Sequence, residues 1–135
     1  MTVSLGYVSF YVSDVPAAVR FYTHAFGFAR RLLTPEEDYG EVDTGATVLS
    51  FVSNDLAETN LAAAGGFTRL DASAPPAGAT ISLITHDVPA ALAAAVDAGG
   101  RAYTGPVDKP WGQTVAYLID PHGILVEIAT PVPEG

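Results

Sequence analysis

The sequence predicts an α+β fold made of two tandem βαβββ modules, whose mixed sheets are concave and surround a central cavity. The five residues Asp-Val-Pro-Ala-Ala occur at 14–18 and again at 87–91, an offset of 73 in a chain of 135 residues. Each copy follows a short run of alternating apolar residues. Each copy is also followed by helix-forming residues that end at a glycine, Gly27 or Gly99. A repeat with matching flanks on both sides indicates a duplicated supersecondary unit.

The repeated residues form the start of a helix in each module. Asp14 and Asp87 can cap the free amides of the first turn. A proline two residues later is tolerated there, because a backbone N–H in the first turn has no partner within the helix and its absence costs nothing. We therefore expect helices over 14–26 and 88–98. In the preceding strand, Val8, Phe10 and Val12 alternate toward the helix.

The remaining elements follow from turn residues and alternation. We interpret 1–135 as one domain in which module one (1–53) and module two (79–131) are joined by a connector (54–78). The connector contains a short helix over 56–64, capped by Asn54-Asp55. The expected strands cover 3–12, 28–34, 39–43, 46–52, 79–85, 101–105, 113–119 and 124–129.

Composition limits the kinds of molecule that the chain is expected to bind. Six basic and fifteen acidic residues give a formal net charge of −9, which argues against nucleic acid and favours a small aromatic or cationic ligand. The acidic residues cluster between Glu36 and Asp43. There is no cysteine, and no apolar run approaches the roughly 20 residues of a membrane span, so we expect a cytoplasmic protein with no membrane partner.

Two long motifs carry a resemblance to a known family. Residues 11–22, with Phe26-Gly27-Phe28, and residues 120–128 resemble the vicinal oxygen chelate superfamily, which includes glyoxalase I, extradiol dioxygenases and bleomycin resistance proteins. The resemblance extends from about residue 4 to 131. It implies the paired-module fold and a homodimer, with the modules paired within one chain or exchanged between two.

The resemblance also implies where metal ligands would stand. Position by position, the four ligand positions of metal-dependent members fall on Tyr7, Ser50, Thr80 and Glu127. Only Glu127 is a ligand type, and a catalytic divalent ion needs about three protein ligands. We therefore expect no metal and no cofactor. His24, His86 and His122 are interpreted as exposed or locally bonded.

Glu127 lies within an apolar strand, where a carboxylate is costly to bury unless it is paired or hydrated. Three interpretations stay open: a general base with a raised pKa, an acceptor for a donor or cation on a ligand, or a water-bonded remnant of an ancestral metal site.

Lys109-Pro110-Trp111-Gly112-Gln113 resembles a stretch of the bleomycin resistance proteins in which the tryptophan helps to line the drug groove. Bleomycin itself is not expected, because Leu32 and Leu33 stand where those proteins are rich in aromatic residues. The predicted ligand-binding residues share an open sheet face or a loop beside it: Tyr7, Ser9, Tyr39, Ser50, Phe67, Trp111 and Glu127. Plain packing is the alternative for Trp111, Tyr39 and Phe67.

The preferred function is binding of a small molecule, as in sequestration of an antibiotic or natural product that confers drug resistance, with no catalytic residue. The alternative is an enzyme of the glyoxalase or dioxygenase type, a lyase or isomerase that uses Glu127 with or without a divalent metal. Nothing specific supports a bare structural module.

Overall fold

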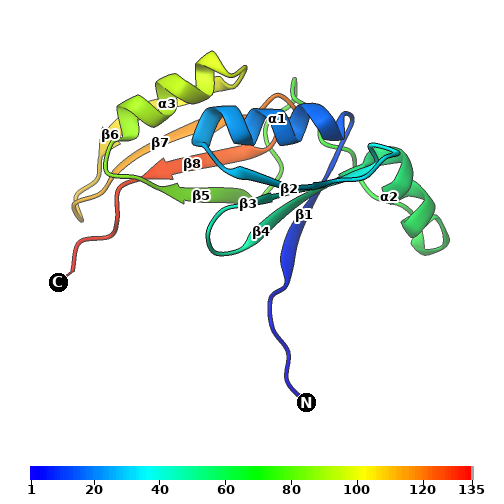
Figure 1. Ribbon diagram of the computed structural model, residues 1–135. Coiled ribbons are helices and arrows are strands. Elements are labelled where there is room, and N and C mark those ends of the chain that lie inside the picture. The colour runs from blue at the N-terminus through cyan, green and yellow to red at the C-terminus, as the bar shows by residue number, and fades with distance from the viewer. Residues whose placement is uncertain (135) are drawn as a thin grey trace. The chain divides into compact units, whose positions relative to one another are not determined.

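The computed structural model describes residues 1–134 and contains two four-stranded mixed sheets and three α-helices (Figure 1). The order of strand, helix and three strands occurs twice, which confirms the α+β class and the two βαβββ modules. The elements are β1 (Tyr7–Val12), α1 (Val15–Phe26), β2 (Ala29–Leu33), β3 (Tyr39–Asp43), β4 (Val48–Ser53), α2 (Asn54–Leu61), the 3₁₀-helix η1 (Ala62–Ala64), β5 (Thr80–Ile84), α3 (Val88–Asp97), β6 (Arg101–Asp108), β7 (Thr114–Ile119) and β8 (Leu125–Ala129).

The two sheets have the same topology. Their strand orders are β1-β4-β3-β2 and β5-β8-β7-β6, and in each the first and last strands of the module are parallel neighbours. The contacts divide the chain into two units: Met1–Thr23 with Gly27–Arg69, and His24–Phe26 with the chain from Leu70 onward. The enclosed cavity and the homodimer stay predictions.

Helix α1, most of which belongs to the first unit, begins and ends as the sequence predicts. The Asp14 carboxylate accepts a hydrogen bond from the amide of Ala17, and Gly27 ends the helix in the left-handed conformation at φ 72°. Tyr22 of α1 stacks on Phe51 of β4 with ring centroids 5.2 Å apart, and both side chains are fully buried. Phe51 pairs in register with Phe10 and Gly40, so this face of the sheet lies under the helix.

In the second unit, α3 lies across one face of its sheet and contacts β6, β7 and β8 (Figure 1). The Asp87 carboxylate caps α3 by accepting from the amide of Ala90. Val88 and Ala95 of the helix are buried, as are Val126 and Ile128 on β8. The small alanine side chains of α3 allow the helix to lie close to the sheet.

Several boundaries differ from the predictions. Strand β1 starts at Tyr7 and not at residue 3, and β4 covers Val48–Ser53 and not 46–52. The connector helix α2 starts at Asn54, because Ser53 is its N-cap and accepts from the amide of Leu56; the cap predicted at Asn54-Asp55 is wrong. Strand β6 continues beyond 105 to Asp108. An irregularity in its pairing with β7 between Thr104 and Val107 accommodates Pro106 on this edge strand.

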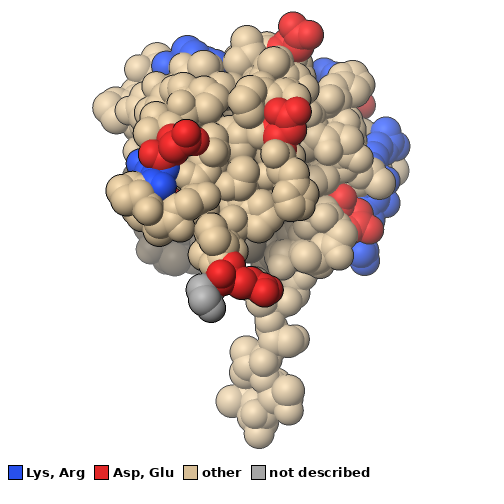
Figure 2. Space-filling view, turned by 90° about the vertical axis from the view of Figure 1, so that its left-hand side faces the viewer, with Lys and Arg blue, Asp and Glu red and all other residues tan. Residues whose placement is uncertain are grey.

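Within residues 1–134, no helix is both long enough and apolar enough to cross a membrane. Charge is dispersed on the face drawn in Figure 2, where acidic side chains lie singly or in small groups among uncharged residues and the basic side chains lie toward the rim. The net charge of −9 is therefore not gathered into one patch on that face.

The close approach of α1 to β3 generates a stability prediction. A Cβ atom added at Gly40 would lie 2.8 Å from Cγ2 of Val19 and 3.2 Å from Cγ1 of Val15. Gly40→Ala should therefore lower the free energy of unfolding by about 1–3 kcal/mol through overpacking, measured by urea denaturation. Gly105→Ala is the matched control, because a Cβ on that strand glycine meets nothing within 4 Å.

Val19→Ala removes the nearer of the two contacting methyl groups, so it should offset part of the cost of Gly40→Ala in a double-mutant cycle. Strictly additive losses in the double variant would contradict the proposed contact.

Candidate functional site

Each sheet has one face covered by its helix and an opposite face that carries polar and aromatic side chains. In the first sheet, Ser9, Ser50 and Glu41 pair in register and lie one residue away from the row that meets α1. Because side chains alternate along strands, this row lies on the opposite side, which we call the first open face. The face also includes Tyr7 and Tyr11 on β1 and Tyr39 on β3.

Two groups of paired side chains lie on the first open face, Ser9 with Ser50 and Glu41 with Tyr39 and Arg31. The hydroxyl oxygens of Ser9 and Ser50 lie 2.5 Å apart, and the Ser50 side chain is fully buried. The Tyr39 hydroxyl donates to Oε2 of Glu41 at 2.5 Å, and Nε of Arg31 lies 3.1 Å from Oε1 of the same carboxylate. Both oxygens of Glu41 are therefore paired.

The environment of Tyr39 changes its acidity. Burial raises the pKa of the Tyr39 phenol above its usual value, and the hydrogen bond to Glu41 raises it further, because both disfavour the phenolate. The nearby Ser50 hydroxyl acts in the opposite direction on the same pKa. Because the net direction is upward, Tyr39 stays protonated at neutral pH.

Aromatic rings flank Ser9 on β1. Tyr7 and Tyr11 are two residues away on either side and share its face, and Tyr7 is 58% exposed. The ring of Tyr11 meets that of Phe67 edge to face, with centroids 4.8 Å apart. Phe67 belongs to the connector, so the connector adds an aromatic wall to the first open face.

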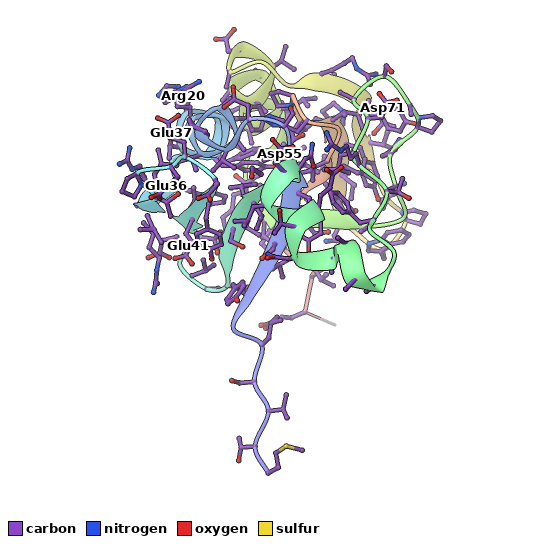
Figure 3. The ribbon with its side chains drawn as sticks, turned by 90° about the vertical axis from the view of Figure 1, so that its right-hand side faces the viewer. Arg20, Glu36, Glu37, Glu41, Asp55 and Asp71 are labelled. Atoms are coloured by element: carbon purple, nitrogen blue, oxygen red, sulfur yellow. The ribbon has the colours of Figure 1, made fainter. Side chains whose placement is uncertain are left out.

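The acidic residues between β2 and β3 do not act together. Glu41 is partly buried and paired, whereas Glu36 and Glu37 are exposed, and Figure 3 shows the three on the same side of the first unit. Asp38 accepts a hydrogen bond from the Thr34 hydroxyl at 2.8 Å and so stabilises the turn. Of this cluster, only Glu41 belongs to the open face through its side-chain contacts.

The second open face has its own polar row, formed by Ser82, Glu127, Tyr117 and Thr104 in register. The Tyr117 hydroxyl donates to Oε2 of Glu127 at 2.8 Å. This bond is the main cause of a raised pKa at Tyr117, and burial and the negative charge of Glu127 add to it. The carboxylate that the sequence places in an apolar strand is therefore hydrogen-bonded to a cross-strand phenol.

Beside that row lies an apolar strip, with Ile84, Ala129, Val115 and Val107 in register. The two outer members, Ile84 and Val107, are 58% and 51% exposed. The two inner members, Val115 and Ala129, are buried. A polar row next to apolar side chains that are exposed at the two edges of the sheet suits an amphipathic small molecule.

Trp111 stands on the tight turn between β6 and β7, at the same end of the sheet as the apolar strip. The turn closes through bonds from Lys109 N to Gln113 O at 2.7 Å and from Gly112 N to Lys109 O at 2.9 Å. Gly112 has φ 104°, which a residue with a side chain rarely adopts. The indole N–H donates to Oε1 of Gln113 at 2.7 Å, and the ring is 59% exposed.

Gln113 fixes the indole further. Its side-chain amide donates to the carbonyl of Thr130 at 2.8 Å, which connects the turn to the end of β8. The ammonium of Lys109 lies 6.0 Å from the centre of the Trp111 ring. The indole is thus held by a chain of hydrogen bonds while much of its surface remains in solvent.

The structure separates the predicted ligand-binding residues into two groups. Five of them, Tyr7, Ser9, Tyr39, Ser50 and Phe67, belong to the first unit and gather on or beside its open face. Trp111 and Glu127 belong to the second unit. The sequence analysis missed Arg31, Tyr11 and Tyr117 as partners. Alternation from Ser9 could have identified Tyr11, whereas Tyr117 depends on the register between β7 and β8, which the sequence does not give.

The residues at the family's ligand positions do not fit a divalent metal. Tyr7 and Ser50 are offset by two residues in the β1–β4 register, and so are Thr80 and Glu127 in the β5–β8 register. They offer one carboxylate among hydroxyls, and one oxygen of that carboxylate already accepts from a phenol. Within residues 1–134, no group of three or more His, Cys, Asp or Glu side chains is placed to hold a metal ion.

The histidines lie outside both polar rows. His24 and His86 are exposed, as predicted. The amide of His122 donates to Asp120 in the turn before β8, and its ring nitrogen Nδ1 is buried with no hydrogen-bond partner among residues 1–134.

Comparison with known structures identifies the fold. The chain is similar to a glyoxalase/bleomycin resistance protein/dioxygenase family enzyme from Burkholderia phytofirmans PsJN, with 21% identity, 97% of this chain and 100% of that chain covered, and a TM-score of 0.78. It is similar to a glyoxalase-related enzyme from Fulvimarina pelagi, with 20% identity, 99% and 94% coverage and a TM-score of 0.78. It is also similar to TioX from Micromonospora sp. ML1, with 21% identity, 95% of this chain and 98% of that chain covered, and a TM-score of 0.69.

No functionally curated protein matches the chain significantly. The profile of the Glyoxalase/Bleomycin resistance protein/Dioxygenase superfamily matches residues 4–128, which is nearly the whole chain. The structural likenesses have low sequence identity and support the fold alone. Together with the repeated βαβββ topology, the profile match shows that the chain belongs to the glyoxalase/bleomycin resistance/dioxygenase superfamily.

Proposed function

We propose that the chain binds a small planar organic molecule on the second open face, beside Trp111, and holds it without converting it. The observation that carries the proposal is the fixed and exposed indole of Trp111. Its N–H is already bonded to Gln113, so the ring surface is what it offers to a ligand. Stacking on such a surface contributes about 0.5–1.5 kcal/mol beyond the burial of area.

The neighbouring side chains suit such a ligand. Ile84 and Val107 expose apolar surface at the edges of the same sheet, and the polar row through Glu127 lies next to them. A planar molecule with a polar edge would contact both. The superfamily's description includes bleomycin resistance proteins, and we extend the proposal to sequestration of an aromatic antibiotic or natural product.

A second candidate function rests on the bond between Tyr117 and Glu127. A carboxylate held by a phenol on an open sheet face could take a proton from a bound substrate, with the phenol stabilising the carboxylate. In this alternative the chain is an enzyme of the lyase or isomerase kind and Glu127 is its general base.

Binding at the indole is tested by titrating the fluorescence of Trp111, the single tryptophan, with planar aromatic antibiotics. We expect saturable quenching, and a loss of affinity of about 5- to 30-fold in Trp111→Ala, followed by calorimetry. Val107→Ala should weaken binding by a smaller factor. Val96→Ala is the matched control, because Val96 is similarly exposed but lies on α3, which covers the other face of the sheet.

Equal affinities for the native chain and Trp111→Ala would contradict this site. Sedimentation of the free protein should accompany the titration to check the predicted homodimer. An indole signal that changes with protein concentration alone would indicate that a second copy covers Trp111.

The two candidate functions differ in the fate of the ligand and in the role of Glu127. For sequestration, mass spectrometry should recover each bound compound unchanged, and Glu127→Gln should not alter that result. Conversion of a compound by the native chain, lost in Glu127→Gln with an unchanged circular dichroism spectrum, would favour the enzyme.

The bond to Glu127 also predicts a titration. The pKa of Tyr117 is raised above its ordinary value, so absorbance at 295 nm should show that this phenol ionises at higher pH than an exposed tyrosine. Glu127→Gln removes the negative charge and should lower that pKa. The folded chain holds this proton up to a higher pH than the unfolded chain does, so the protonated phenol of Tyr117 contributes to the free energy of unfolding. That contribution is complete below the unfolded pKa and is lost as the pH rises through the folded pKa. An unchanged tyrosine titration in Glu127→Gln would contradict the assigned contact.

A further inference from the structure

We propose that the first open face carries a separate binding site at its outer edge, where the guanidinium of Arg31 binds the carboxylate of an aromatic acid. The site consists of Arg31, Leu32, Tyr39 and Glu41 and lies entirely within the first unit. It is independent of Trp111. It rests on the ion pair that holds Arg31 and on the irregular register of β2, the edge strand that carries Arg31.

The register of β2 directs Arg31 onto the open face. Arg30 pairs with Val42 and Leu32 pairs with Glu41, so two steps along β2 match one step along β3 and Arg31 is the extra residue. An extra residue interrupts the regular alternation and re-aims a side chain. The contact with Glu41 shows that Arg31 turns toward the open face. Strand β6 has an irregularity at the corresponding place, so the feature belongs to the duplicated module.

One end of the Arg31 guanidinium is fixed. Its Nε lies 3.1 Å from Oε1 of Glu41, and the Tyr39 hydroxyl donates to Oε2 of the same carboxylate at 2.5 Å. The Glu41 side chain is only 16% exposed, so the carboxylate that holds Arg31 is itself held. A guanidinium that is ordered before the ligand arrives loses less conformational entropy on binding.

The other end of the guanidinium is open to solvent. The Arg31 side chain is 58% exposed, and among residues 1–134 its one polar partner is Glu41, reached through Nε. The two terminal nitrogens are therefore available to a ligand. A guanidinium can only donate and stays charged, and its planar N–H groups match the two oxygens of a carboxylate. This end of the site thus suits an anion and not a cation.

The acidic character of the chain does not prevent binding of an anion here. The hydrogen bond from Tyr39 stabilises part of the negative charge of Glu41, so Glu41 does not fully neutralise Arg31. The net charge of −9 repels anions at long range, but physiological salt screens that repulsion over about 8 Å. Direct hydrogen bonds between a guanidinium and a carboxylate are much shorter than this distance, so the local donor decides.

Apolar surface beside Arg31 favours an aromatic acid over a small one. Leu32 is in register with Glu41 on the open face and is 43% exposed. Tyr39 lies two residues from Glu41 on β3, shares that face and is partly exposed. A planar ring attached to the carboxylate would cover the exposed part of Leu32 and pack against the phenol.

The experiment compares 2-naphthoate with 2-naphthylmethylammonium, which share a ring system and differ in the sign of their charge. Binding is followed in ¹H–¹⁵N spectra of the full chain at physiological salt, including the side-chain Nε–H signal of Arg31. The native protein should bind 2-naphthoate with shifts centred on Arg31 and Leu32, and the ammonium compound should bind there at least about tenfold more weakly. Arg31→Gln should weaken 2-naphthoate binding about 10- to 100-fold.

Arg30→Gln is the matched control. It changes the net charge as Arg31→Gln does, but Arg30 is exposed and pairs with Val42, one residue away from the row of Glu41, so binding should be unchanged. Arg31→Lys keeps the charge without the planar donors and should also lose most of the affinity. Leu32→Ala should weaken binding about 3- to 10-fold. Native-like spectra of each variant verify that it folds.

The proposal is overturned if Arg31→Gln and Arg30→Gln weaken binding alike, if Arg31→Lys binds as the native protein does, or if 2-naphthoate leaves the Arg31 side-chain signal unchanged. It is also overturned if that signal shifts with protein concentration alone, because a carboxylate of a second copy would then occupy Arg31. Trp111→Ala should leave 2-naphthoate binding at Arg31 unchanged. Failure of the Trp111 site and failure of the Arg31 site are therefore separate results.

Discussion

The parallel pairing of the first and last strands in each module determines which side chains meet on its open face. Pairing of β1 with β4 sets Ser9 beside Ser50, and pairing of β5 with β8 sets Ser82 beside Glu127. A shift of one residue in either register would turn these side chains toward the helix and expose the apolar row instead. The large apolar contacts under α1 and α3 therefore hold the polar rows in place.

The two modules provide a hydrogen-bond donor for the carboxylate of their polar row in different ways. In the first, the carboxylate is on the third strand of the module, and Tyr39 reaches it from two residues away on the same strand. In the second, Glu127 is on the last strand and Tyr117 reaches it from the neighbouring strand. Both solutions give a half-buried carboxylate a phenolic donor, which offsets much of the cost of removing it from water.

The repeated Asp-Val-Pro-Ala-Ala was sufficient to predict the duplicated topology, because capping by Asp14 and Asp87 is local chemistry. Alternation along β1 correctly placed Tyr7 and Ser9 on the face away from the helix. The sequence did not reveal that Tyr117 reaches Glu127 or that Arg31 reaches Glu41. Those contacts depend on register and on the irregularity in the β2–β3 pairing between Arg30 and Leu32, which are set by packing of the whole sheet.

Net charge and local geometry have different roles in recognition by this chain. A charge of −9 attracts every cation, and salt screens that attraction over about 8–10 Å, so it cannot distinguish one organic cation from another. Discrimination requires short-range groups whose donor or acceptor character is fixed before the ligand arrives. A lone serine can rotate to suit either partner, whereas the Glu41 carboxylate can only accept and both of its oxygens are already paired with Arg31 and Tyr39. Side chains whose donor or acceptor character is fixed in this way can provide specificity that neither the net charge nor the aromatic walls supply.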